Sequence, residues 1–288
     1  MRPENLKTKI FLDSGDTEET KKALEILGFL DGQTTNPSLI AKTPEAQERL
    51  AKGDKFSHEE INDYYRGVVT ELARLIPEGS ISVEVYSDSD SLTDEMFEQA
   101  KEMYAWIPDN AYIKYPTTVE GLEAAAKSVE VKIPVNMTLC FSQEQAAAIY
   151  SATKSAGIGK VYCSPFIGRL DDRGENGMEF IENILKMYSS GDGHVEVLTA
   201  SVRNLNHHLD ALSLGSDIIT APFKVLKEWA EGGMVIPDGE FQYKSNDLSP
   251  IPYKEIDINS DWTSLDIQHD LTDVGMEKFT ADWKSLLK

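Results

Sequence analysis

A lysine inside an apolar run is the first residue of this chain that suggests chemistry. In the stretch "NAYIKYPTT", Lys114 stands between Ile113 and Tyr115 in what reads as a buried strand. Burial disfavours a charged ammonium, and the neutral amine is the nucleophilic form of a lysine. An amine in a pocket with separate carboxylates can form an imine with a carbonyl compound. A structural reading stays open, in which Lys114 reaches the rim of a pocket and only pairs with Glu84 or Asp13.

Further polar side chains alternate with apolar ones in other strand-like runs. Residues two apart along a strand point to the same face, so apolar neighbours on the opposite parity leave each polar residue facing a common interior. Singly, residues such as Asn36 or Thr138 are usually caps or turn residues, but their convergence favours a shared site. The residues on this face are Asp13, Glu84, Lys114, Asn136, Thr138, Ser164, Phe166 and Ser201.

Repeated strand-helix units would position these residues. Eight β-rich runs are expected as strands, at 9–13, 31–36, 80–85, 111–116, 131–139, 160–166, 194–201 and 216–222. Helical spacing of apolar residues fills the intervals, and Asp16, Thr93, Thr118 and Ser142 stand where a side chain would cap the following helix. The pattern predicts an α/β fold, a closed (β/α)8 TIM barrel; a doubly wound open sheet could use the same alternation, but convergence on one rim favours closure.

Length and charge narrow the class of protein. A chain of 288 residues with 41% hydrophobic content suits a single barrel domain, 1–288, and a formal charge of -21 disfavours nucleic acid and anionic membrane as partners. There is no apolar run of about 18 residues, and the start lacks a secretory pattern, so we expect a cytoplasmic protein. Cys140 and Cys163 are spaced for neither zinc nor a disulfide framework and are expected to be reduced core residues.

Two arginines in this acidic chain predict an anion site. Arg169 follows the sixth predicted strand, while Ser201 and Arg203 bracket the end of the seventh. Arginine binds phosphate in a bidentate manner, and the late loops of a barrel are a frequent phosphate site. A sulfonate would present a similar group. The alternative is that Arg169 merely pairs with Asp171 or Asp172.

Six blocks of sequence, in order, resemble the transaldolase family, which comprises Schiff-base-forming class I aldolases on a (β/α)8 barrel. The resemblance covers nearly the whole chain, apart from insertions around 43–60 and 232–268. The blocks are "KIFLDSGDTEETKKALEILGFLDGQTTNPSLI", "YIKYPTTVEGLEA", "NMTLCFSQEQA", "YCSPFIGRLDDRGENGM", "TASVRN" and "LTDVGMEKFTADWKSLL".

The resemblance implies a role for each matching residue. Lys114 would form the Schiff base with a ketose phosphate, and Asp13 would take the proton of the C4 hydroxyl. Glu84 and Thr138 would position a water and shuttle protons. Hydrogen bonds to the substrate would come from Asn36, Asn136 and Ser164, with Phe166 as an aromatic wall. The phosphate would be bound by Arg169, Ser201 and Arg203.

The resemblance also separates a transferase from its relatives. The related fructose-6-phosphate aldolase usually has glutamine in place of Glu84 and tyrosine in place of Phe166, so this chain looks like a transaldolase acting between sugar phosphates. The alternatives are the aldolase, a sulfosugar transaldolase, and a sugar-phosphate-binding barrel without turnover. No metal or other cofactor is implied, and the adjacent His207 and His208 are expected on a helix surface.

The insertion at 232–268 precedes the C-terminal helix and is rich in Pro, Gly, Asn, Asp and Ser, so little regular structure is expected there. In short members of the family the terminal helix docks on a neighbouring subunit of a ring-shaped oligomer. A homo-oligomer is therefore one option, and a long connector could change that assembly.

Overall fold

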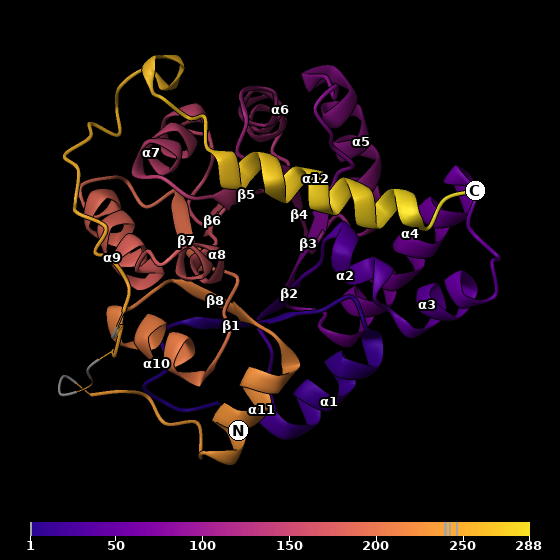
Figure 1. The fold of residues 1–288 in the computed structure, drawn as a ribbon, viewed down its shortest axis with the longest axis horizontal. Helices are drawn as coiled ribbons and strands as arrows, with labels where there is room; N and C mark the ends of the chain where they lie inside the picture. Colours follow the sequence, from indigo (N-terminus) through magenta and orange to yellow (C-terminus); the bar gives the residue numbers. More distant parts are fainter. Residues whose placement is uncertain (1, 239–240, 242, 246) are drawn as a thin grey trace.

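The computed structural model describes residues 2–238, 241, 243–245 and 247–288, and its centre is a closed barrel of parallel strands (Figure 1). Each strand pairs with the next along the chain, and β1 pairs with β8 to close the ring. The predicted (β/α)8 barrel is confirmed, and each predicted strand overlaps an observed one. The strands are β1 (Lys9–Asp13), β2 (Gly32–Thr34), β3 (Ser80–Glu84), β4 (Ala111–Pro116), β5 (Val135–Cys140), β6 (Val161–Pro165), β7 (Val195–Thr199) and β8 (Ile218–Ala221).

Helices surround the barrel and join consecutive strands (Figure 1). They are α1 (Thr17–Leu27), α2 (Pro37–Ala41), α3 (Pro44–Ala51), α4 (His58–Leu75), α5 (Thr93–Trp106), α6 (Val119–Glu130), α7 (Gln143–Ala152), α8 (Ile167–Asp172), α9 (Gly177–Tyr188), α10 (Leu205–Leu214), α11 (Phe223–Glu231) and α12 (Asp270–Ser285), with a 3-10 turn η1 (Trp262–Ser264). Among the described residues, no helix combines the length and apolar character needed to cross a membrane.

Side-chain caps fix the starts of several helices. Asp16, Thr118 and Ser142 each accept a hydrogen bond from a backbone N–H in the first turn of α1, α6 and α7, as predicted. Thr93 was the wrong choice for α5, because the cap position is Leu92 and the Thr93 hydroxyl donates to Glu123 instead.

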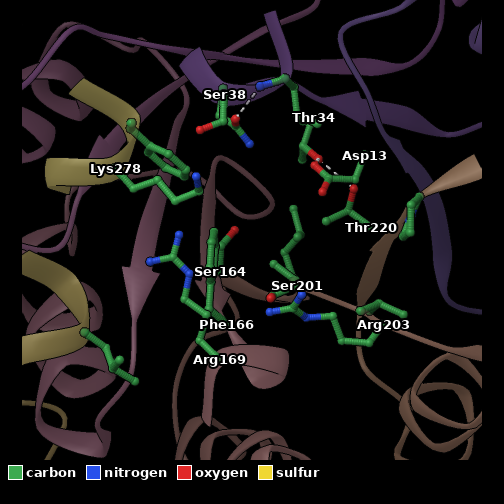
Figure 2. Close-up of a pocket in the computed structure, with 18 of the residues that line it drawn as sticks. Asp13, Thr34, Ser38, Ser164, Phe166, Arg169, Ser201, Arg203, Thr220 and Lys278 are labelled. Carbon is green, nitrogen blue, oxygen red and sulfur yellow. Dashed lines mark hydrogen bonds between the residues drawn. The ribbon is translucent and has the colours of Figure 1, made fainter. Parts of the chain in front are cut away.

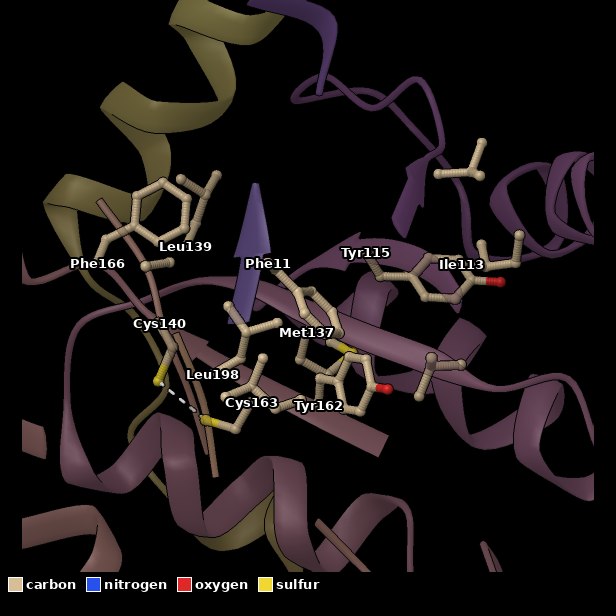
Figure 3. Close-up of a cluster of buried hydrophobic side chains, with 14 of the residues drawn as sticks. Phe11, Ile113, Tyr115, Met137, Leu139, Cys140, Tyr162, Cys163, Phe166 and Leu198 are labelled. Atoms are coloured by element: carbon tan, nitrogen blue, oxygen red, sulfur yellow. Dashed lines mark hydrogen bonds between the residues drawn. The ribbon is translucent and has the colours of Figure 1, made fainter. Parts of the chain in front are cut away.

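The strand alternation sorts side chains between two environments. Tyr115 points outward and its hydroxyl lies 2.7 Å from Ser128 Oγ of α6, while its neighbour Lys114 faces the interior of the barrel. Cys140 and Cys163 are buried free thiols with their sulfur atoms 3.9 Å apart, as expected of reduced core residues (Figure 3). The core therefore lies mainly between the strands and the helices.

Aromatic side chains fill the part of the barrel interior that lies next to the inward-facing polar side chains. Phe11 packs edge-on against Tyr162 with ring centres 6.0 Å apart, and Tyr112 stacks on Tyr162 at 4.1 Å. These residues stand two positions before Asp13, Ser164 and Lys114 on the same faces of β1, β6 and β4. They form a floor beneath the polar side chains, as in other packed barrel interiors.

The C-terminal helix α12 lies across the mouth of its own barrel (Figure 1). The Thr272 hydroxyl donates to the carbonyl oxygen of Leu139 at 2.9 Å, and the Thr280 hydroxyl donates to that of Ser87 at 2.8 Å. Within the segment 232–268, residues 239, 240, 242 and 246 lie outside the described residues, and η1 is the regular element of the part that is described. The long connector thus carries the chain back to its own barrel.

Candidate active site

A cavity of about 660 Å³ opens at the C-terminal ends of the strands, beneath α12 (Figure 2). This volume suits a small-molecule site. The cavity brings together most of the residues predicted from the sequence. Those that line it are Asp13, Asn36, Lys114, Ser164, Phe166, Arg169, Ser201 and Arg203.

Lys114 is buried and yet reaches the cavity. Its side chain is 3% exposed, and its Nζ lies 3.0 Å from Glu84 Oε2 and donates to the carbonyl oxygen of Thr35 at 3.3 Å. Tyr65 supports both neighbours, since its hydroxyl accepts from the Glu84 backbone N–H at 2.9 Å and lies 2.7 Å from Thr35 Oγ1. The pairing with Glu84 and the access to the cavity are both present, so an ion pair alone does not describe this lysine.

Glu84 and Thr138 flank Lys114 on the two adjacent strands. Burial raises the pKa of Glu84, and the Lys114 ammonium opposes part of that rise. Thr138 follows Asn136 by two residues on β5, and within the described part of the chain its buried hydroxyl has no hydrogen-bond partner. Neither residue lines the cavity directly. A buried hydroxyl without a partner is uncommon in folded proteins and is suited to bind a water or a substrate atom.

Asp13 has a hydrogen-bond chain of its own, distinct from the pair of Lys114 and Glu84. The Thr34 hydroxyl donates to Asp13 Oδ1 at 2.6 Å, and Thr34 Oγ1 lies 2.6 Å from Thr220 Oγ1 (Figure 2). Burial raises the pKa of Asp13, while the hydrogen bond from Thr34 and the charge of Lys114 oppose the rise. A carboxyl group with a raised pKa at the cavity wall is suited to accept and return a proton.

The polar residues expected to bind substrate hydroxyls are already partly engaged. Asn36 Oδ1 accepts from the Leu39 backbone N–H at 2.9 Å and so caps α2, while the residue still lines the cavity. Asn136 does not line the cavity. Its Nδ2 donates to Ser82 Oγ at 2.9 Å, and its Oδ1 accepts from Ser164 Oγ at 2.6 Å. Asn136 therefore holds Ser164 in place, and Ser164 faces the cavity.

Arg169 and Arg203 approach the cavity from neighbouring strand ends. Arg169 lies in α8 after β6, and Arg203 follows β7 beyond Ser201, whose φ of 59° is left-handed. The Gly168 N–H donates to the Ser201 carbonyl oxygen at 3.2 Å, and no room is left at Gly168 for a Cβ atom. This contact joins the two turns and places both arginines at one end of the cavity.

The two arginines differ in their partners. Arg203 Nη2 lies 2.7 Å from Asp172 Oδ2, whereas no ion pair to Arg169 is found across the described residues. Asp171 instead pairs with His207 Nε2 at 2.8 Å. Pairing of Arg169 with either aspartate is thus not observed, and burial, followed by the nearby charge of Arg203, lowers the pKa of Arg169. Arg169 is the arginine left available for an anion.

The placement of the two adjacent histidines on a helix surface is wrong. His207 and His208 of α10 are both buried. His207 Nδ1 accepts from the Arg203 backbone N–H at 3.3 Å, so that His207 links Asp171 to the turn that carries Arg203. Two adjacent residues of α10 are both buried because this helix packs against α9 and α11 as well as against the barrel.

Sequence reasoning missed several residues of the cavity wall. Thr34 and Thr220 have a signal, since each is a threonine near the end of a strand on the inward face. The residues of α12 have no such signal, because the sequence leaves open whether this helix packs on a neighbouring subunit or elsewhere. The additional lining residues include Thr34, Ser38, Lys42, Thr220, Leu271, Val274, Lys278 and Phe279.

A family model and similar proteins of known sequence both indicate the same family for this chain. The family model described as Transaldolase/Fructose-6-phosphate aldolase matches residues 10–288. A protein of Dehalococcoides mccartyi named probable transaldolase is 35% identical over 280 residues, covering 97% of this chain and all of that protein. A probable transaldolase of Thermoplasma volcanium is 34% identical, covering 96% of each.

Among solved structures, 3-hexulose-6-phosphate synthase from Salmonella typhimurium is similar in fold. The TM-score is 0.50 at 10% identity, with 78% of this chain and 97% of that one covered. At this identity the likeness concerns the barrel architecture alone.

Proposed function

The chain belongs to the transaldolase/fructose-6-phosphate aldolase family, and on this premise we propose that it transfers a dihydroxyacetone unit from a ketose phosphate to an aldose phosphate. The observation that carries the proposal is Lys114, a buried amine at the wall of a cavity, 3.0 Å from a carboxyl group. Amines of this kind add to ketones to form imines.

In the proposed reaction, the Lys114 amine adds to the C2 carbonyl of the donor. Loss of water from the carbinolamine gives a protonated imine, with Glu84 and Thr138 moving the protons. Asp13 then removes the C4 hydroxyl proton and the C3–C4 bond breaks. The electron pair of this bond passes to the imine to give an enamine, and the part that begins at C4 leaves as an aldehyde. The enamine adds to the aldehyde of the acceptor, and hydrolysis releases the new ketose from the lysine.

Substrate recognition is divided between two parts of the cavity. Ser164, Asn36 and Phe166 are proposed to hold the three-carbon unit near Lys114, with Asn136 fixing Ser164. Arg169, with Arg203 and Ser201, is proposed to bind the phosphate. A half-buried guanidinium without a carboxylate partner among the described residues supports this assignment, because in a chain of charge -21 an anion needs a local cation.

Reductive trapping tests the proposal. Treatment with borohydride and fructose 6-phosphate should add a covalent adduct to Lys114, detected by mass spectrometry of the digested protein. Lys114→Met should abolish both the adduct and turnover, because the thioether cannot form an imine. An adduct on another lysine, or near-normal turnover of this variant, would remove the central assignment. Absence of both the adduct and turnover in the unaltered protein would instead favour the non-catalytic binding barrel.

Product analysis separates transfer from simple cleavage. With an aldose phosphate acceptor, the new ketose should accumulate, and without it the enamine should persist on the enzyme. Glu84 and Phe166 favour this outcome, since the aldolase relatives usually have glutamine and tyrosine there. Release of free dihydroxyacetone at the full rate without acceptor would assign the aldolase reaction instead, and preference for a sulfonated donor would assign the sulfosugar reaction.

A further inference from the structure

The guanidinium of Arg169 is enclosed by rings from two separate elements. Its Cζ lies 5.6 Å from the ring centre of Phe166, which follows β6, and 5.8 Å from that of Phe279 in α12. The Phe279 ring centre is also 6.0 Å from Lys114 Nζ. The C-terminal helix therefore forms the wall shared by the amine and the arginine.

Gly275 lies one turn before Phe279 on the same helix and leaves space for the arginine. A Cβ atom at Gly275 would lie 2.7 Å from Arg169 Nη1 and 2.6 Å from Leu139 Cδ2. Both distances are too short for real contacts. A side chain at this position would have to displace the guanidinium, so the glycine sets how closely α12 approaches Arg169.

The helix that bears these two residues is fixed at both ends. Near its start, the buried Thr272 hydroxyl donates to the Leu139 carbonyl oxygen and accepts from Gln145 Nε2, both at 2.9 Å. Near its end, the Ser38 hydroxyl of α2 donates to the Asp282 carboxylate. Between these anchors, Gly275 and Phe279 hold a defined place over the cavity.

We infer that Gly275 and Phe279 are positioning residues, which hold the Arg169 guanidinium in the orientation that binds the substrate's phosphate. Arg169 has no carboxylate partner in the described structure to orient it, and a long side chain left free would lose more entropy on binding the anion. The C-terminal helix would thereby set the preference for donors with an anionic end. The inference rests on the proposed function, in which Arg169 binds that group.

The variant Gly275→Ala tests this inference without threatening the fold. Alanine is favoured over glycine inside a helix, and the atoms that must move are the ends of flexible side chains. We expect the KM for fructose 6-phosphate to rise roughly tenfold, since displacement of a catalytic or binding group by about 1 Å has large effects. The kcat should stay within about twofold, as should kcat/KM for unphosphorylated fructose.

A matched control is Gly67→Ala in α4. This glycine is also in a helix, but a Cβ atom there meets nothing within 4 Å. It should leave every kinetic constant unchanged. Phe279→Leu, which keeps an apolar side chain but removes the ring, should raise the KM for fructose 6-phosphate in the same direction as Gly275→Ala.

A double variant shows whether the effect passes through the arginine. Arg169→Ala alone should raise the KM for fructose 6-phosphate, and adding Gly275→Ala should raise it no further. If Arg169→Ala raises the KM while Gly275→Ala does not, the inference is wrong and the proposed function stands. The inference is also wrong if Gly275→Ala acts equally with and without Arg169. If Arg169→Ala leaves the KM unchanged, the anion site itself is misassigned.

Discussion

At the scale of residues, the site separates two carboxyl groups around one amine. Glu84 is 3.0 Å from Lys114 Nζ, whereas Asp13 is held by the hydroxyl of Thr34. Burial raises the pKa of both, so each is closer to neutrality than an exposed carboxyl group would be. Two carboxyl groups with different partners can take different proton transfers in one reaction.

The pH dependence of catalysis should report the Asp13–Thr34 hydrogen bond. Thr34→Val removes a hydrogen bond that lowers the pKa of Asp13, so the pKa should rise further above its usual value. A hydrogen bond to a charged group is worth about 1.5 kcal/mol or more, which corresponds to about one pH unit. Because the base must be deprotonated, the acid limb of kcat/KM should move to higher pH.

The control is Thr220→Val, which leaves the bond between Thr34 and Asp13 in place. Its pH profile should follow that of the unaltered protein much more closely. An acid limb that does not move in Thr34→Val, or that moves to lower pH, would show that Asp13 is not the base whose protonation limits the reaction.

At the scale of elements, α12 is the part of the structure that completes the cavity. It supplies Lys278 and Phe279 to the wall, and in Figure 2 the Lys278 side chain points into the cavity. The contact of α12 with the barrel depends on the end of β5, where Leu139 has a left-handed φ of 59°. This conformation turns the Leu139 carbonyl oxygen into a partner for Thr272.

The hydrogen bonds of Thr272 should contribute measurably to stability. Thr272→Val leaves the carbonyl oxygen of Leu139 without its hydroxyl donor and removes one acceptor of Gln145. Unsatisfied buried groups cost about 1–3 kcal/mol, so the free energy of unfolding in urea should fall by that amount. Thr280→Val, at a less buried hydroxyl, should cost less. An equal or smaller loss in Thr272→Val would contradict the assigned seat of α12.

The sequence was informative for the barrel and less so for the segments around its mouth. Strand alternation identified Lys114, Asp13 and Ser164 because each inward residue has apolar neighbours that must face the helices. The short helix α8 was not predicted, because a stretch of six residues that includes Gly168 has little helical signal. The roles proposed for the site residues stay predictions.

The position of α12 over the mouth of the barrel could not be predicted from its sequence. Its amphipathic pattern predicts a helix that packs on something, but the identity of the partner depends on how the preceding connector runs. The same limit applies to His207 and His208, since two adjacent helical residues can both be buried only where neighbours cover both sides. Such contacts are set by the tertiary structure and not by local spacing.

At the scale of the whole molecule, burial of His208 should make the fold sensitive to acid. Its ring packs against Trp229 with centres 4.8 Å apart, and burial lowers the pKa of His208 to about 3 from an ordinary 6.5. Below pH 6.5, His208 therefore binds a proton in the unfolded chain, whereas the buried His208 of the folded protein stays neutral. Stability is lost as the pH falls from 6.5 towards 3.

Urea unfolding at pH 6.5 and pH 5 would measure this loss. The contribution of His208 should amount to about 2 kcal/mol over that interval, and His208→Leu should lack it. The control His58→Gln, at an exposed position of α4, should keep the full acid sensitivity. If His208→Leu loses stability as steeply as the unaltered protein, the acid sensitivity has another source.

The place of Phe279 near the end of the chain has a consequence for synthesis. A ribosome makes the N-terminal part first, so the strands can emerge and close into a barrel before the last residues appear. The helix that encloses Arg169 follows all eight strands in the chain and is therefore translated after them. A nascent chain would therefore have its amine in place while still lacking one wall of the pocket, and the proposed anion site would be complete only after α12 has emerged.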